Sequence, residues 1–252
     1  MDVYDYPMYY EFAFSYQEVK KQVDFFETVV RNFGKKSIRR FLDIGCGTSP
    51  QLREIARRGY EAVGLDINPK MFQYLRQMAA KEGLKVETVQ ADMRDFKLKK
   101  KCDFAFCLSG SLAVSSNQEF LKHLQCVANA LSAEGIYLLE NTALELKLYG
   151  YQDWTMKKDE LEIKATFEMK MIDPMKQISE GILTLEVNDR GERKKLINIE
   201  ATKDFAPQEL KTIVELDGHF RFLGFFKHLS LEPLQQPTDS NIILMQKIAS
   251  RM

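Results

Sequence analysis

Residues 41–50 read FLDIGCGTSP, which joins a strand pattern to a glycine turn. The segment from Arg40 to Ile44, which is mostly apolar in its last four residues, is a strand candidate. Gly45 and Gly47 follow it and predict a tight turn, where the backbone can approach a ligand that a Cβ atom would block. Pro50 suits the first position of a helix. We therefore predict a strand–turn–helix unit with a ligand site at the carboxyl end of the strand.

Strand and helix patterns alternate from residue 37 to about residue 140. The predicted strands are Arg40 to Ile44, Glu61 to Leu65, Lys85 to Gln90, Cys102 to Leu108 and Ile136 to Glu140. The predicted helices are Pro50 to Arg58, a helix capped by Asn68 that runs to Lys81, and Asn117 to Leu131. Such alternation favours right-handed crossovers and a parallel sheet that is covered on both faces.

The pattern changes after residue 160. Three strand-like runs, separated by turn residues, are Glu162 to Ile172, Ile178 to Val187 and Lys195 to Ala201. They predict a small antiparallel meander inserted into the α/β domain. A helix, Pro207 to Leu216, and two strands, Phe220 to Phe226 and Ile242 to Ile248, follow.

The predicted fold class is α/β, with a Rossmann-like, mostly parallel, seven-stranded sheet, helices on both of its faces, and the small inserted antiparallel sheet. Three parts of the chain are expected. Residues 1–150 form the N-terminal, ligand-binding part of the α/β domain, residues 151–204 form the meander, and residues 205–252 complete the large sheet.

The composition is that of an ordinary globular protein. The chain has 36 basic and 36 acidic residues and no net charge, which argues against a nucleic-acid partner, since phosphate contacts need an excess of cations. No apolar run approaches the roughly 20 residues of a membrane-spanning helix. The N-terminus carries two acids and no basic segment, and the four cysteines form no CxxC pair. We expect a reduced, cytoplasmic protein without a membrane or metal site.

Asp66 indicates what the glycine turn would bind. It ends the second predicted strand, 21 positions beyond Gly45, where a carboxylate can accept two hydrogen bonds from a ribose diol. The same spacing fits an NAD-dependent oxidoreductase, but that fingerprint needs glycine or alanine at its third position. Pro50 stands there and has no N–H to offer a phosphate. A nucleoside cofactor without a pyrophosphate is favoured, and the oxidoreductase remains the weaker alternative.

Several motifs occur in the order of a known family. FLDIGCGTSP resembles the first motif of class I S-adenosylmethionine-dependent methyltransferases, AVGLDINPKM their second, and QADMRDF their third. PMYYEFAFSY resembles the N-terminal segment that folds over the cofactor in some small-molecule members. The resemblance covers residues 4–145, and the meander is similar to that of sugar-amine and glycine N-methyltransferases. One departure is Ser49, where the family most often has glycine.

The resemblance implies S-adenosylmethionine as the cofactor and assigns residues to its methionine end. Gly45, Cys46 and Gly47 would line this end of the molecule. Leu108, at the end of the fourth strand, would border the methyl-transfer region. Tyr10 would close the site from the N-terminal segment.

The same resemblance assigns four residues to the adenosine end. Asp66 would hold the ribose hydroxyls, and Ile67 would pack on the adenine. Asp92 would take the adenine amino group, with Met93 beside it.

The activity implied is methyl transfer by in-line displacement to an N or O atom, with a small molecule as the acceptor. The cofactor carries the reactive group, so no fixed catalytic constellation is required. A base could assist, but His123 is interpreted as a structural residue and His219 and His228 as residues at the edge of the core. No catalytic residue is assigned.

Two further alternatives stay open. The chain could bind S-adenosylmethionine without turnover, because the cofactor motifs would be identical. It could also methylate RNA or protein. The fourth strand is followed by Leu108-Ser109-Gly110-Ser111 and not by an Asn-Pro-Pro-Tyr-like motif, which argues against methylation of a planar base or amide nitrogen.

The exposed edge of the meander is the expected place for a homodimer contact.

Overall fold

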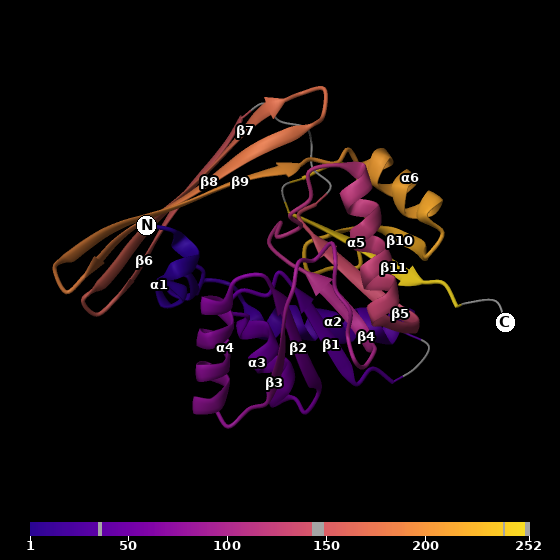
Figure 1. Cartoon of the computed structure of the whole chain (residues 1–252), viewed down its shortest axis with the longest axis horizontal. Helices are drawn as coiled ribbons and strands as arrows, with labels where there is room; N and C mark the ends of the chain where they lie inside the picture. The colour runs from indigo at the N-terminus through magenta and orange to yellow at the C-terminus, as the bar shows by residue number, and fades with distance from the viewer. Residues whose placement is uncertain (35–36, 143–148, 239, 250–252) are drawn as a thin grey trace.

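The computed structural model describes residues 1–34, 37–142, 149–238 and 240–249. Two sheets form its frame, one of seven strands in the order β10-β11-β5-β4-β1-β2-β3 and one of four in the order β6-β7-β8-β9 (Figure 1). The strands of the larger sheet are β1 (Arg40–Ile44), β2 (Glu61–Asp66), β3 (Val86–Gln90), β4 (Cys102–Cys107), β5 (Leu131–Glu140), β10 (Phe220–Lys227) and β11 (Asn241–Lys247).

The larger sheet confirms the predicted fold class. Strands β1 to β5 run parallel, whereas β11 pairs antiparallel with both β5 and β10. The carboxyl ends of β1 to β5 and of β10 therefore meet at one edge of the sheet. This is the edge where open parallel sheets bind ligands.

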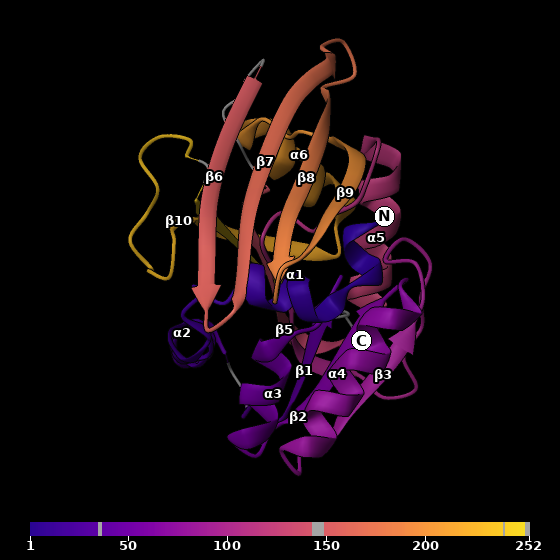
Figure 2. The same ribbon diagram turned by 90° about the vertical axis from the view of Figure 1, so that its left-hand side faces the viewer.

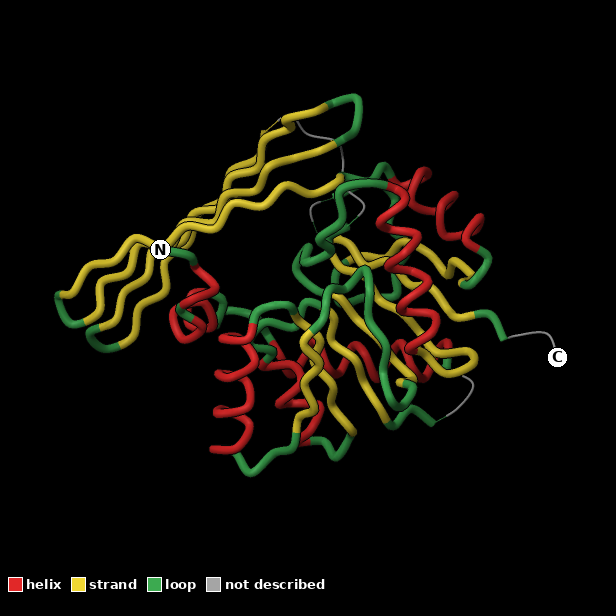
Figure 3. The backbone as a smooth tube through the Cα atoms, viewed as in Figure 1, coloured by secondary structure: helices red, strands yellow, loops and turns green. Residues whose placement is uncertain are grey.

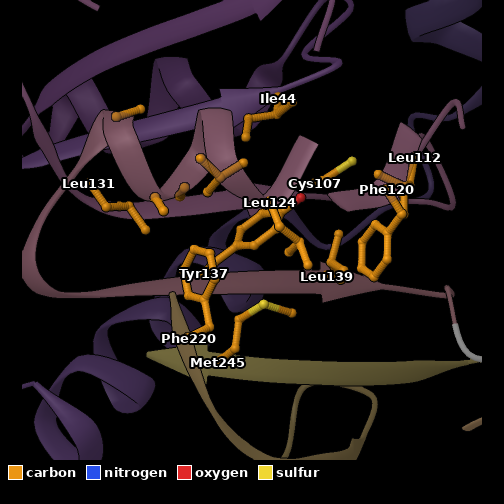
Figure 4. Close-up of a cluster of buried hydrophobic side chains, with 14 of the residues drawn as sticks. Ile44, Cys107, Leu112, Phe120, Leu124, Leu131, Tyr137, Leu139, Phe220 and Met245 are labelled. Carbon is orange, nitrogen blue, oxygen red and sulfur yellow. The ribbon is translucent and has the colours of Figure 1, made fainter. Parts of the chain in front are cut away.

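Helices cover both faces of the larger sheet. Helices α2 (Val19–Phe33), α3 (Pro50–Arg57) and α4 (Pro69–Lys81) bury apolar side chains against one face. Helices α5 (Asn117–Ala130) and α6 (Pro207–Asp217) cover the other. Figure 4 shows part of this second core, where Leu124 of α5 lies beside Tyr137 and Leu139 of β5. Helix α2 was not predicted, although its apolar positions recur at helical spacing.

The antiparallel sheet is larger than predicted. Its strands are β6 (Tyr149–Lys158), β7 (Leu161–Asp173), β8 (Ile178–Asp189) and β9 (Glu192–Lys203), so the meander has four strands and not three. The prediction missed β6 because that edge strand is mostly exposed and lacks a clear apolar alternation. The four strands twist strongly along their length (Figure 3).

The N-terminal segment joins the two sheets. Helix α1 (Pro7–Ala13) lies at their junction and contacts both α4 and β7 (Figure 2). Trp154 of β6 donates from its indole Nε1 to the Ala13 carbonyl at 2.7 Å, and the Tyr9 hydroxyl donates to Asp189 at 3.0 Å. Together with a cluster of buried side chains from the segment and the sheet, these bonds anchor the N-terminus on the meander.

Among the described residues, no helix has the length and apolar character that crossing a membrane requires.

His123 of α5 generates a test of the large core. The side chain is fully buried, with Nδ1 at 3.0 Å from the Met93 carbonyl oxygen and Nε2 at 2.6 Å from the Tyr137 hydroxyl. Burial lowers the pKa of His123 to about 4, against 6.5 for an ordinary histidine. The unfolded chain therefore binds a proton below about pH 6.5 that the folded protein rejects.

We expect this histidine to reduce the free energy of unfolding as the pH falls from about 6.5 to about 4, because its contribution is fully present only above 6.5. Urea denaturation at a series of pH values measures the slope. His123→Gln should flatten it, whereas His219→Gln, at a half-exposed histidine, should not. An unchanged slope in His123→Gln would mean that carboxylates alone cause the acid sensitivity.

Candidate active site

The glycine turn after β1 follows the predicted local geometry. Gly45 and Gly47 have φ of 68° and 52°, a region that residues with a Cβ atom rarely adopt. A Cβ at Gly45 would lie 3.2 Å from Cβ of Ser111, so the turn also lacks space for a side chain. The turn is therefore closely packed against the loop that follows β4.

Several amides of this turn already have partners inside the protein. Gly45 and Cys46 donate to the Leu65 carbonyl at 2.8 and 3.0 Å, and Gly47 donates to Asp66 Oδ2 at 2.7 Å. Pro50 has no N–H, and Leu52 donates to Ser49 Oγ at 3.1 Å. A pyrophosphate is held by free amides at such a helix start, so these hydrogen bonds disfavour a dinucleotide.

Ser49 shows how the chain accommodates its departure from the family pattern. Its φ is 34°, in the left-handed region that glycine adopts easily. The Ser49 hydroxyl caps α3 and donates to Asp43 Oδ2 at 2.6 Å. Two hydrogen bonds of the side chain therefore stabilise a backbone conformation that glycine would adopt without them.

Asp43 is a buried carboxyl group at the wall of the site. Only 4% of the residue is exposed, and no cation pairs with it among the described residues. Burial raises the pKa of Asp43 to about 8, the hydrogen bond from Ser49 opposes this shift, and the charge of Asp66 adds to it. Such a group is stabilised in its ionised form by any cation that enters the site.

The two residues predicted at the ribose and adenine lie at the end of β2. Asp66 accepts from Gly47 with one carboxylate oxygen and from the Asn68 amide with the other, at 2.7 and 2.8 Å. Each oxygen keeps a second lone pair for a ligand. Ile67, the next residue, is 66% exposed at the surface beside this carboxylate.

Asp92 follows β3 and is engaged by Arg94. The guanidinium of Arg94 donates to both carboxylate oxygens, at 2.9 and 2.6 Å, and its amide donates at 2.8 Å. These hydrogen bonds lower the pKa of Asp92. Met93 extends toward the glycine turn, where its terminal methyl lies 3.4 Å from the position of a Gly45 Cβ.

A cavity of about 230 Å³ lies against the glycine turn. Five of the nine residues predicted for the cofactor line it, namely Tyr10, Gly45, Cys46, Gly47 and Leu108. The other four, Asp66, Ile67, Asp92 and Met93, do not line it and lie along the neighbouring strand ends. Tyr10 covers the turn, with its ring 3.9 Å from the position of a Gly47 Cβ.

A second cavity of about 720 Å³ lies between the two sheets. The two cavities share Tyr10, Phe14, Gln17, Ser109 and Ser111, so they adjoin each other. Aromatic and acidic side chains line much of the larger one, among them Tyr4, Tyr16, Trp154, Phe167, Glu140, Glu200 and Asp204.

The prediction missed several residues of the larger cavity. Glu140 ends β5, a position where a carboxylate signals a site at the shared sheet edge, and this signal was available in the sequence. His228 and the strands β6 and β9 come from distant parts of the chain, and no local pattern indicates that they meet.

Comparison with known proteins agrees with this geometry. Residues 41–135 match the family described as a methyltransferase domain. A curated relative, a ubiquinone biosynthesis O-methyltransferase of Nitrosococcus oceani, is 28% identical over 106 residues. The match covers 42% of each chain, so this protein spans less than two thirds of that relative.

Solved structures share the fold along nearly the whole chain. An S-adenosylmethionine-dependent methyltransferase from Clostridium acetobutylicum is similar with a TM-score of 0.79, at 18% identity and covering 96% of this chain and 97% of its own. An amino pentose methyltransferase from Micromonospora echinaspora, solved with S-adenosylmethionine, has a TM-score of 0.68 at 16% identity, covering 90% and 91%.

These likenesses confirm the resemblance that the order of the motifs indicated. The family match covers strands β1 to β4 and the first half of β5, and the structural likeness extends over the meander as well. Residues 41–135 are therefore similar to a methyltransferase domain, and the fold of the chain is that of solved S-adenosylmethionine-dependent methyltransferases.

Proposed function

We propose that this protein transfers a methyl group from S-adenosylmethionine to an N or O atom of a small molecule. The observation that carries the proposal is the pair of adjoining cavities, one against the glycine turn and one between the two sheets. In-line transfer needs the donor and the acceptor to meet within one enclosed space. The five residues that line both cavities lie where the donor and the acceptor would meet.

The smaller cavity suits the methionine end of the cofactor. Gly45, Cys46, Gly47 and Leu108 would line it, Tyr10 would close it, and Asp43 would face the ammonium group. When bound, S-adenosylmethionine supplies a methyl group activated by its sulfonium. The protein's part is to hold the acceptor in line with that methyl and to exclude water.

The adenosine end would lie along the neighbouring strand ends. Asp66 keeps lone pairs that suit a ribose diol, and Ile67 offers an exposed apolar side chain for the adenine. Met93 would lie beside them. Asp92 would accept a hydrogen bond from the adenine amino group. Its Oδ2 accepts one hydrogen bond from Arg94 and keeps a second lone pair for this contact.

The larger cavity would take the acceptor. Its position under the second sheet and its volume of about 720 Å³ suit a small molecule better than a polymer. One structural neighbour is an amino pentose methyltransferase, and the curated relative is an O-methyltransferase. These two names motivate one amine and one hydroxyl compound, an aminosugar and a catechol, as the first acceptors to test.

Two further predictions of the sequence belong to this proposal. A cytoplasmic location is supported by four cysteines that are all free. Self-association is proposed at the edge strand β6, where Tyr149 and Tyr151 are more than half exposed.

The cofactor choice can be tested by thermal denaturation. S-Adenosylhomocysteine should raise the melting temperature, because a ligand that binds only the folded state stabilises that state. NAD at the same concentration should leave it unchanged, because the turn amides are already bonded. Stabilisation by NAD and not by S-adenosylhomocysteine would contradict the proposal.

The role of Asp66 can be tested by Asp66→Asn. We expect the affinity for S-adenosylhomocysteine, measured by calorimetry, to fall by about 1–3 kcal/mol, the range for a hydrogen bond left unmade to a buried or charged group. Asp103→Asn is the matched control, because Asp103 also accepts two backbone amides, from Arg39 and Arg40, but near the opposite edge of the sheet. Equal affinity in Asp66→Asn and the native protein would show that the ribose is held elsewhere.

Asp43 should make cofactor binding depend on pH. With a pKa of about 8, the free protein keeps this carboxyl group protonated near neutrality, and a bound ammonium would favour its ionised form. Binding of S-adenosylhomocysteine should therefore release a proton at pH 7 and strengthen as the pH rises from 6 to about 8. Calorimetry in two buffers of different ionisation enthalpy measures this release. Asp43→Asn should abolish it, and an undiminished release would assign the proton to another group.

A further inference from the structure

A histidine–carboxylate pair lies in the larger cavity, assembled by the pairing of three strands. Glu140 ends β5 and is paired with Ile242 of β11, whose neighbour Asn241 is paired with Lys227 at the end of β10. His228 is the next residue after Lys227. The antiparallel strand β11 thus brings His228 to the same sheet edge as Glu140, although 88 positions separate them in the sequence.

The two side chains lie within ion-pair distance of each other. His228 Nδ1 lies 3.1 Å from Glu140 Oε1, and the Ser109 amide donates to Glu140 Oε2 at 2.7 Å. Glu140 is 3% exposed, so the carboxylate is held in position and shielded from water. Since Nδ1 is the ring nitrogen close to the carboxylate, Nε2 is the nitrogen that can accept a proton from a group bound in the cavity.

The pair adjoins the place where methyl transfer would occur. Both residues line the larger cavity, and Ser109, which donates to Glu140, lines both cavities. The side chain of His228 is 41% exposed, so its imidazole is accessible as well as oriented. No other described histidine lines this cavity: His123 is buried under α5, and His219 precedes the opposite end of β10.

We propose that His228 is the catalytic base that removes the proton from the acceptor, and that Glu140 is the residue that positions it. This inference rests on the proposed methyltransferase function. The acceptor's lone pair attacks the methyl carbon of S-adenosylmethionine, and the carbon–sulfur bond breaks with its electron pair passing to sulfur. The proton that the acceptor nitrogen or oxygen loses passes to His228 Nε2. The Glu140 carboxylate stabilises the resulting imidazolium, which later releases the proton to solvent.

The charges around the pair determine the pH range over which the rate of methyl transfer should change. The nearby Glu140 carboxylate raises the pKa of His228. Lys227 beside it is paired with Glu232 at 2.6 Å. The other charged or titratable groups at the cavity wall are Tyr4, Tyr10, Tyr16, Glu18, Tyr149, Tyr151, Glu200, Lys203 and Asp204. Because His228 acts as a base when neutral, the rate should increase as the pH rises through its pKa, and loss of the Glu140 charge should move this limb to lower pH.

Three variants test the proposal. His228→Asn keeps an N–H that can reach Glu140 but cannot accept a proton. Glu140→Gln keeps the shape and the acceptor for Ser109 but removes the charge. His219→Asn is the matched control, because His219 also contacts a carboxylate, Asp217 at 2.9 Å, and is exposed to a similar extent, 42%.

Each variant is assayed for methyl transfer to glucosamine and to catechol, for S-adenosylhomocysteine affinity, and for histidine protonation by NMR of ¹⁵N-labelled imidazoles. In His228→Asn we expect kcat to fall by about 100-fold or more, the usual contribution of a general base, with KM and S-adenosylhomocysteine affinity within about twofold of the native protein. Glu140→Gln should lower both the NMR midpoint of His228 and the acid limb of the rate. His219→Asn should change none of these quantities.

Transfer by His228→Asn at the native rate would overturn the proposal, and so would a His228 midpoint that does not move in Glu140→Gln. Failure of the native protein to bind S-adenosylhomocysteine would instead refute the methyltransferase function itself. The affinity measurement therefore separates the two failures.

Discussion

The parallel pairing of β1 with β2 and β4 is the constraint on which the site depends. It brings the ends of these strands to one edge, so that the glycine turn, Asp66 and Leu108 lie together there. The Gly47 amide donates to the Asp66 carboxylate, which links the two strand ends directly. A shift of one residue in this register would turn the buried face of each strand toward the opposite layer of helices, and the edge would lose its arrangement.

The second sheet converts this edge into an enclosed site. A parallel sheet alone offers an open crevice at its strand ends. Here the meander extends over that crevice, and α1 fills the junction between the two sheets (Figure 2). The hydrogen bonds of Trp154 and Tyr9 anchor the N-terminal segment to the meander. Tyr10, between these anchors, consequently lies over the glycine turn and on the boundary of both cavities.

Charge is distributed unevenly between the two cavities. Asp43, in the smaller one, is a buried carboxyl group whose pKa is raised to about 8 by burial, so it responds to an entering cation. Glu140, in the larger one, already faces His228 at 3.1 Å. The first arrangement suits the binding of an ammonium group, and the second suits the movement of a proton. Of these two carboxyl groups, only Glu140 has a basic partner among the described residues.

The sequence by itself determined the α/β fold class and the positions of its first five strands along the chain, because these depend on local periodicity, turn residues and helix caps. It also indicated the glycine turn and Asp66, which lie close together in the chain. Edge strand β6 was not predicted, because its mostly exposed residues lack apolar alternation. Only the tertiary structure decided that His228 meets Glu140 and that the meander encloses the site. Those contacts join segments that are far apart in sequence, through strand pairing and packing that no local pattern encodes.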